Sequence, residues 1–441
     1  MVILIKAAQL ILSLSILVII HEFGHFIFSK AFKCRVEKFY LFFDPWFSLF
    51  KFKRGETEYG IGWLPLGGYV KISGMIDESM DKEQMKLPPE PWEFRSKPSW
   101  QRLIIMIGGV LFNLILAIVL YSAVLFVWGE EYLPTKNAKF GIAVNETGRE
   151  MGLRSGDKII SIDGKEVEDF NKIAITLLLD GVKTIEVQRN EEVIVIPVKD
   201  EIIPKLITDR AVIGLRVPYS CNVIGFSKDS PARDAGFEIG DEIMAINGTG
   251  FQFYDQFSDT VAISKGKIIN VLIKRNGVDK VIPVKIGTAG LLGIRPKTKI
   301  EGIFEYKTIH YGFLESIPAG ISRGYQQVGN YLKQFKLLFA PETKAYESLG
   351  GFIAIGNIFP SVWDWESFWL LTALLSIILA VMNILPIPAL DGGHVLFLLF
   401  EIITGRKPSD KFLEYSQIVG MVILFSLLIY ANGNDIWKLF K

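Results

Sequence analysis

The sequence predicts a polytopic α-helical membrane protein with four transmembrane helices and two tandem α+β modules inserted between the second and third of them. Four apolar segments are each long enough to cross about 30 Å of hydrocarbon. The long segment 129–366 contains an internal repeat, which indicates tandem modules. The third observation is His21-Glu-Phe-Gly-His25, a cluster of ionisable residues inside the first apolar segment. Such residues are costly in a membrane and indicate a function.

The composition agrees with this class of protein. Half of the residues are hydrophobic, and a formal net charge of +1 gives no indication of a nucleic-acid partner. Cys34 and Cys221 fall in different predicted regions, so we expect no disulfide framework. The first apolar segment carries the His-Glu-x-x-His residues where a signal-peptide cleavage site would be, and we interpret it as a retained membrane helix.

The distribution of basic residues predicts the orientation of the four spans. Lys30, Lys33 and Arg35 follow the first span, and Arg406 and Lys407 lie in the 390–414 connection. The positive-inside tendency makes the 29–102 and 390–414 connections cytoplasmic. Both termini and segment 129–366 are then outside. The predicted spans are about 7–28, 103–128, 367–389 and 415–431.

The first connection contains an apolar, glycine-rich stretch at 59–72 that is too broken for a helix, and its end, Tyr69-Val-Lys-Ile72, suggests a strand. Apolar non-helical backbone is tolerated at membrane depth where it is buried in protein or lines a cavity. We interpret the stretch as a re-entrant or membrane-associated hairpin. A cytosolic hairpin with one apolar face is the alternative.

The outer segment repeats itself. Gly152-Leu, Gly156-Asp157, Ile162 and Gly164 recur at an offset of 84 as Gly236-Phe, Gly240-Asp241, Ile246 and Gly248. The repeat predicts two modules, each with short strands, a Gly-Asp turn and one helix, at about 168–180 and 253–264. The pattern Gly-x-x-x-Gly-Asp-x-Ile-x-x-Ile-Asp/Asn-Gly resembles permuted PDZ domains of bacterial proteases. That resemblance implies binding of peptide C-termini by strand addition; a spacer that binds nothing is the alternative.

The connector after the modules is amphipathic. Segments 312–321 and 328–339 have apolar residues at helical spacing, and Lys333 and Lys336 lie among them. Such helices lie along a lipid surface or pack on the membrane bundle, and the sequence leaves both open.

His21 and His25 stand at i and i+4, so their side chains lie one above the other on one helix face. This spacing lets both imidazoles bind one zinc ion and leaves Glu22 free as a general base. A catalytic zinc takes a third protein ligand. Asp391 and His394, in Leu390-Asp-Gly-Gly-His394, are both candidates, and spacing alone does not decide between them.

With these motifs in this order, the sequence resembles the site-2 protease family, and within it the bacterial regulator-of-sigma-E protease type. The resemblance rests on the following stretches: His21–His25, Leu64-Pro-Leu-Gly-Gly-Tyr-Val70, Asn113, the tandem PDZ-like modules, Ser348-Leu-Gly-Gly351, Asn383 and Leu390–His394. It covers essentially the whole chain. It implies a zinc-dependent intramembrane endopeptidase acting on single-span membrane proteins such as anti-sigma factors or signal-peptide remnants.

The resemblance also implies roles for single residues. His21, His25 and Asp391 would bind Zn²⁺, with Glu22 as base and His394 outside the ligand set. The family's membrane-associated β element would correspond to 59–72 and pair with an extended substrate. The implied substrate-binding residues are Asn383, Gly67, Gly68, Tyr69 and Asn113, and for Asn113 helix packing is an equal alternative.

The predicted organisation follows. Residues 1–128 form the first half of the membrane domain with a cytoplasmic or re-entrant β region at 35–102; 129–217 and 218–298 form the PDZ-like modules; 299–366 is the outer connector; 367–441 completes the membrane domain. The expected location is the bacterial inner membrane, with the modules in the periplasm and the active site toward the cytoplasm.

Two other functions compete with this one. The first is a membrane-anchored PDZ scaffold with an inert zinc motif. The second is a zinc protease of the multispanning prenyl-protein type, which would use a distal glutamate, and Glu401 is available.

Overall fold

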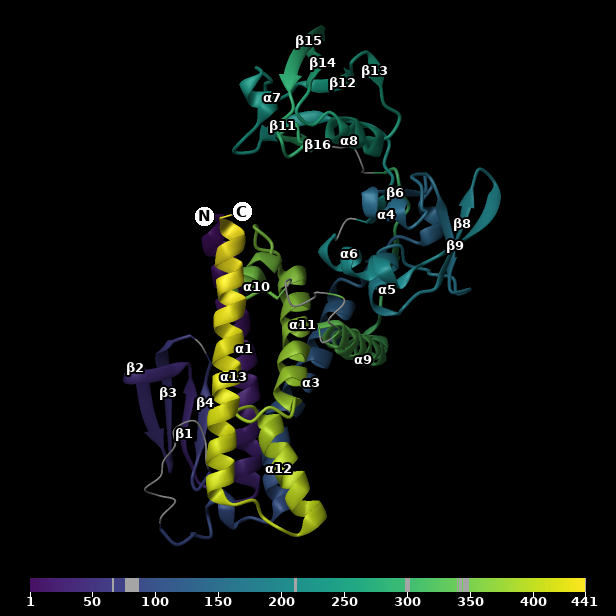
Figure 1. The fold of residues 1–441 in the computed structure, drawn as a ribbon. Coiled ribbons are helices and arrows are strands. Elements are labelled where there is room, and N and C mark those ends of the chain that lie inside the picture. Colours follow the sequence, from purple (N-terminus) through teal and green to yellow (C-terminus); the bar gives the residue numbers. More distant parts are fainter. Residues whose placement is uncertain are drawn as a thin grey trace. The chain divides into compact units, whose positions relative to one another are not determined.

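The computed structural model describes residues 1–65, 67–75, 87–209, 212–297, 302–338, 340, 343 and 349–440. Leu66 and Ser348, which belong to two of the motifs above, lie outside the described residues. The chain divides into two compact units (Figure 1). The first comprises Met1–Glu130, Ile309–Phe339 and Tyr346–Lys441, and the second comprises Glu131–Thr308 and Ala340–Ala345.

The first unit is a helix bundle with a small sheet beside it. Its helices are α1 (Val2–Ala31), α3 (Ser99–Val127), α9 (Phe313–Leu338), α10 (Phe352–Ile358), α11 (Trp365–Ile384), α12 (Asp391–Thr404) and α13 (Asp410–Leu439), and its strands are β1 (Val36–Leu41), β2 (Phe43–Arg54), β3 (Thr57–Leu64) and β4 (Tyr69–Ile72). Within the described residues, four helices are long and apolar enough to cross a membrane: α1, α3, α11 and Lys411–Leu439 within α13.

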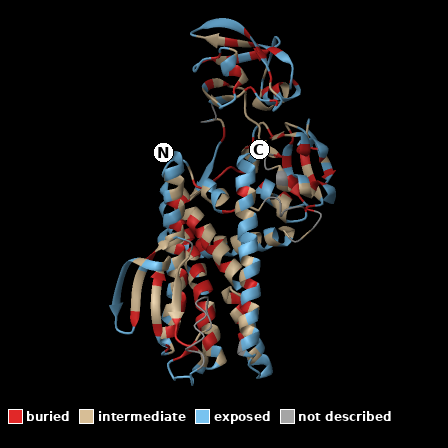
Figure 2. Cartoon of the chain, turned by 60° about the vertical axis from the view of Figure 1, so that its left-hand side comes forward, coloured by how far each residue is buried: buried red, intermediate tan, exposed pale blue. Residues whose placement is uncertain are grey.

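Helix α3 forms the centre of the bundle and packs against α1, α9, α11 and α12. Glycines bring α1 and α3 together, because a Cβ atom on Gly24 would lie only 2.2 Å from the carbonyl oxygen of Gly108. Buried residues gather on the facing sides of the helices, whereas α13 is exposed along most of its length (Figure 2). That exposed apolar surface is typical of a helix in contact with lipid.

The small sheet has the strand order β2-β3-β1-β4 and lies along α1 (Figure 1). Strands β1 and β3 run parallel, and the other two pairings are antiparallel. Among the described strands β4 pairs only with β1, so its other edge is unpaired. Gly68, just before β4, faces Val18 and Glu22 of α1, so β4 begins close to the His-Glu-x-x-His segment.

The end of the third span differs from the prediction. Helix α11 ends at Ile384 rather than Ala389, because Pro386 and Pro388 remove donors from the continuing helix. The predicted 390–414 connection contains α12, a helix of 14 residues that begins at Asp391. Helix α13 is also longer than the predicted 415–431 span.

The second unit contains the two repeated modules. The first has helices α4 (Glu146–Glu150), α5 (Lys172–Leu179) and α6 (Ile203–Thr208), with strands β5 (Glu130–Tyr132), β6 (Ile142–Val144), β7 (Lys158–Ile162), β8 (Thr184–Arg189), β9 (Glu192–Pro197) and β10 (Ile213–Leu215). The second has α7 (Pro231–Asp234), α8 (Tyr254–Ile263), β11 (Asn222–Phe226), β12 (Glu242–Ile246), β13 (Thr249–Gly250), β14 (Ile268–Arg275), β15 (Val278–Lys285) and β16 (Ile294–Lys297), and β17 (Lys307–Ile309) returns to pair with β5. Each module has its own hydrophobic core.

The repeated Gly-Asp turn holds a buried ion pair in both modules. Asp157 accepts hydrogen bonds at 2.7 Å from Nε and Nη2 of Arg189. Asp241 accepts equivalent bonds from Arg275, at 2.7 and 2.8 Å. Both carboxylates also accept a backbone N–H bond at 2.8 Å from three residues upstream. The repeated sequence motif therefore forms the same buried aspartate–arginine ion pair in both modules.

Candidate metal centre

Helix α1 supplies two of the three converging side chains. His21 and His25 are buried and one turn apart, and their Nε2 atoms lie 3.3 Å from each other. His21 is ten residues from the end of α1 at Ala31, which places it about 15 Å from that end. His25 is six residues from the same end, so the pair lies inside the C-terminal part of a candidate span, about 9 to 15 Å from the end of the helix.

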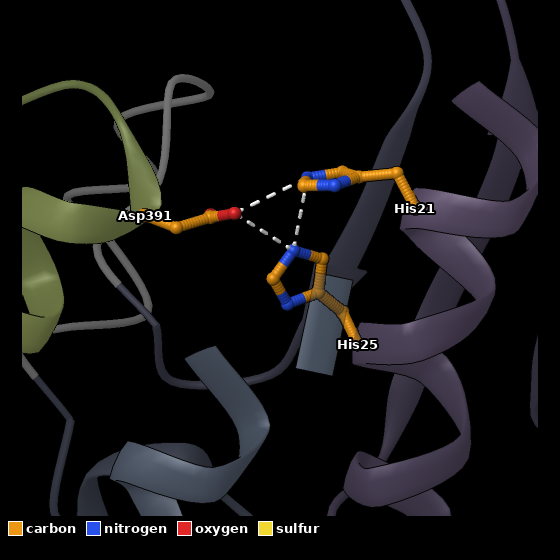
Figure 3. Close-up of side chains that lie close together, drawn as sticks. All are labelled: His21, His25 and Asp391. Atoms are coloured by element: carbon orange, nitrogen blue, oxygen red, sulfur yellow. Dashed lines mark hydrogen bonds and ion pairs between the residues drawn. The ribbon is translucent and has the colours of Figure 1, made fainter. Parts of the chain in front are cut away.

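The third side chain comes from the other end of the sequence. Asp391 is the first residue of α12, and it follows a turn in which Ala389 has a φ of 84°. Its Oδ2 atom lies 3.2 Å from Nε2 of His21 and 3.3 Å from Nε2 of His25 (Figure 3). A helix N-terminus favours a carboxylate at this position.

Contacts behind the two imidazoles fix their tautomers. Nδ1 of His25 lies 2.9 Å from the carbonyl oxygen of Ile105, so it carries the proton and donates it. Nδ1 of His21 lies 3.1 Å from the amide nitrogen of Asn113, whose Oδ1 is buried without a partner. The oxygen and nitrogen positions of an asparagine amide are assigned from the hydrogen bonds around them. With the two positions of Asn113 exchanged, its Oδ1 accepts the Nδ1 proton of His21.

Both Nε2 atoms are then unprotonated acceptors, and they face a carboxylate oxygen. Oδ2 of Asp391 is itself buried without a hydrogen-bond donor. Three lone pairs within 4.8 Å of one another repel unless a cation lies between them. Two imidazoles and one carboxylate are a donor set that zinc binds in catalytic sites, where a fourth position stays open for water. Within the described chain, this is the one group of three such ligands.

Three residues on one face of α3 lie against the two histidines. Ile105 and Asn113 provide the two contacts just described, and Gly109 stands midway between them, at i+4 from each. A Cβ atom on Gly109 would lie 2.4 Å from Nε2 of His25 and 2.6 Å from Cε1 of His21. Sequence reasoning missed Gly109. Its signal was the Gly108-Gly109 pair in an apolar helix, where small residues permit close approach.

Glu22 is outside the ligand group and faces the sheet. A Cβ atom on Gly68 would lie 3.5 Å from Cγ of Glu22 and 2.6 Å from the carbonyl oxygen of Tyr40. The backbone of Val70, on β4, also faces the Glu22 carboxyl. A carboxylate beside the metal ligands, rather than among them, is placed to exchange protons with a bound water.

The remaining predicted residues lie around this centre. Asn383 is in the last turn of α11, with its amide nitrogen 3.3 Å from Nε2 of His21. Gly67, with a φ of 149°, and Gly68 lead into β4. The hydroxyl of Tyr69 donates to Asp44 at 2.8 Å. Burial and this hydrogen bond hold the pKa of Tyr69 above its ordinary value, so Tyr69 remains a donor.

His394 and Glu401 lie apart from the ligand group. His394 is one turn along α12 from Asp391 and lines a cavity on that helix. Glu401 accepts a hydrogen bond at 2.5 Å from Nη2 of Arg102. The geometry therefore favours Asp391 over His394 as the third ligand, and it does not support the distal glutamate of the prenyl-protein alternative.

Comparisons with known proteins agree with a zinc site. The model of Peptidase family M50 matches residues 9–427. The chain is 29% identical over 455 residues to "Regulator of sigma E protease" of Haemophilus influenzae, covering 97% of this chain and 98% of the relative. It is 28% identical to "Putative zinc metalloprotease" of Vibrio cholerae, with the same coverage. It is 29% identical to "Protease RseP" of Yersinia pestis over the full length of both chains.

Proposed function

The chain belongs to Peptidase family M50 and is a zinc metalloendopeptidase, and from that premise we propose that it cleaves peptide bonds within transmembrane segments of other membrane proteins. One observation carries the proposal. His21 and His25 lie inside the C-terminal part of a helix that is long and apolar enough to cross a membrane, ten and six residues before its end. A bond cleaved there lies at the depth of the hydrocarbon.

The residues around the centre have different roles in peptide-bond hydrolysis. His21, His25 and Asp391 would hold zinc, which polarises water and the scissile carbonyl when bound. Glu22 removes a proton from the attacking water and delivers it to the leaving amine. The amide of Asn383, beside His21, donates a hydrogen bond to the carbonyl oxygen of the substrate. Hydrogen bonds of this kind stabilise charge that develops in the transition state.

The unpaired edge of β4 would bind the substrate. A transmembrane helix has all its backbone groups bonded internally and must unwind before a carbonyl reaches the centre. Pairing with Tyr69–Ile72 replaces the lost bonds. Gly68 lets this strand approach Glu22, because a Cβ atom there would lie 2.6 Å from Cγ1 of Val18 and 3.5 Å from Cγ of Glu22 on α1.

The partners follow from this mechanism. The substrates are single-span membrane proteins, and the likeness to a regulator of sigma E protease favours an anti-sigma factor or signal-peptide remnants among them. Basic residues after α1 favour a cytoplasmic active site and periplasmic modules in a bacterial inner membrane. The PDZ-like modules would bind peptide C-termini or exclude substrates with large outer domains.

Mapping of the scissile bond tests the proposal. A single-span substrate is reconstituted with the protein in liposomes, and the products are identified by mass spectrometry. We expect termini inside the apolar segment of the substrate. Cleavage confined to the soluble flanks would contradict the proposal, even if the activity depends on zinc.

A further inference from the structure

A cavity of about 70 Å³ lies between the start of α3, one face of α12 and the start of α13. It shares no side chain with the metal ligands or Glu22, although α12 contributes to both sites. Much of its wall is apolar, with Phe397, Leu398 and Leu413 among the lining residues. A volume of this size admits several waters or one small polar group.

Gln417 is the unusual residue of this cavity. Its side chain lines the wall and is 95% buried, being only 5% exposed. No described residue gives it a hydrogen bond. A buried amide without a partner is unfavourable. Gln417 therefore brings an amide donor and an amide acceptor to the wall of this cavity, where a ligand with a polar group can bind them.

The charges around the cavity indicate the sign of that group. Its lining contains three cations, Arg95, Arg102 and Lys407, and one carboxylate, Glu401. Glu93, which is not among the lining residues, pairs with Arg95 at 2.5 Å, so one positive charge remains in excess. Arg102 is oriented by two bonds, from Nη2 to Glu401 at 2.5 Å and from Nε to the carbonyl oxygen of Lys97 at 2.9 Å. A guanidinium fixed in this way suits a phosphate, since its planar donors match phosphate oxygens.

We propose that this cavity binds a phosphate group, with Gln417 and Arg102 as its principal donors. The phosphate is that of an anionic phospholipid, whose chains continue over the apolar wall, or free inorganic phosphate. Gly393, His394 and Phe397 of α12 line the same cavity. A bound phosphate group therefore stabilises the position of α12, the helix that begins at Asp391. The site is independent of the metal ligands, and its binding can be measured without peptide cleavage.

The test uses the purified full-length protein in a neutral detergent. Thermal unfolding and native mass spectrometry are followed on addition of short-chain phosphatidylglycerol, the matching diacylglycerol, or inorganic phosphate. We expect phosphatidylglycerol or inorganic phosphate to bind and raise the Tm, and diacylglycerol to have no effect. Whichever of the two phosphate compounds gives the shift identifies the source of the phosphate.

Gln417→Leu and Ser426→Leu provide the matched pair of variants on α13. Loss of the Gln417 hydrogen bond weakens ligand binding about tenfold, while the ligand-free Tm stays equal or rises because a buried unpartnered amide is removed. Ser426 is exposed on the same helix, and its variant keeps wild-type binding. The proposal is overturned if neither phosphate compound binds, if diacylglycerol stabilises equally, or if Gln417→Leu binds as wild type does.

Discussion

At the scale of single residues, the metal centre depends on groups behind the ligands. His25 donates to the carbonyl of Ile105, and His21 contacts the Asn113 amide. These contacts place the proton on Nδ1 of each ring and leave Nε2 for the metal. Contacts of this kind commonly contribute a factor of 10–100 to metal affinity.

Asn113→Leu tests this role. The substitution keeps the volume of the side chain but removes the acceptor for His21, so we expect zinc affinity to fall about 10- to 100-fold. Competition with a zinc chelator measures it. Gln9→Leu is the control, because Gln9 is another fully buried polar residue of the bundle and contacts Ile5 and Pro360 rather than the centre. Equal zinc affinity in the two variants would assign Asn113 to helix packing alone.

At the scale of elements, the approach of α3 to α1 determines whether the ligands can converge. Gly24 and Gly108 allow backbone contact, and Gly109 leaves room for both imidazoles. The centre is therefore assembled by helix packing as well as by the ligands themselves.

Gly109→Ala should disrupt the centre while the bundle still forms. Its methyl group would lie 2.4 Å from the Nε2 atom of His25, so we expect loss of bound zinc and of cleavage. Gly433→Ala on α13 is the control, since no atom lies within 4 Å of its new methyl group. Metal analysis of both purified proteins distinguishes them, and retention of zinc by Gly109→Ala would contradict this geometry.

The ion pair between Asp241 and Arg275 should make the stability of the second module depend on pH. Burial raises the pKa of Asp241, but hydrogen bonds from Arg275 and from the Glu238 backbone outweigh it, and the pKa lies below its ordinary value. The stabilisation is therefore complete above the ordinary aspartate pKa and is lost as the pH falls through the lowered value. Hydrogen exchange in residues 236–285 should accelerate in that acidic range. Asp241→Asn should exchange faster already at neutral pH and show little further change; a wild-type-like profile in this variant would contradict the assignment.

At the scale of the whole molecule, the repeated modules are inserted between α3 and α9, so they interrupt the membrane bundle in sequence. Their ends are joined by the pairing of β5 with β17. An insert with adjacent ends can be removed without separating the helices that flank it.

Deletion of 135–296 tests the proposed filter. We expect the full-length protein to discriminate against single-span substrates that retain a large outer domain, and the shortened protein to cleave them. Substrates already trimmed on the outside should be cleaved equally by both proteins. If the ratio of cleavage of untrimmed to trimmed substrate is unchanged by the deletion, the modules have another role.

Much of this architecture can be predicted from sequence because apolar length and motif spacing are local signals. The four spans and the His-Glu-x-x-His pattern are of this kind. Helix α12 was not predicted, because its glycines and the preceding prolines resemble a loop locally, and the helix depends on packing against α3. Within the predicted β region at 35–102, only the stretch at 59–72 gave a strand signal, since β2 is long, irregular and exposed. The roles of Gly109 and Gln417 depend on neighbours far away in sequence, which no local pattern shows.

The most direct test of the central claim compares wild type with Glu22→Gln. Purified proteins are assayed for zinc content and for cleavage of a single-span membrane substrate. We predict about one zinc per chain in both proteins and cleavage only by wild type, because glutamine cannot accept the proton of the attacking water. Equal cleavage by both proteins, or wild-type protein that cleaves without zinc, would contradict it.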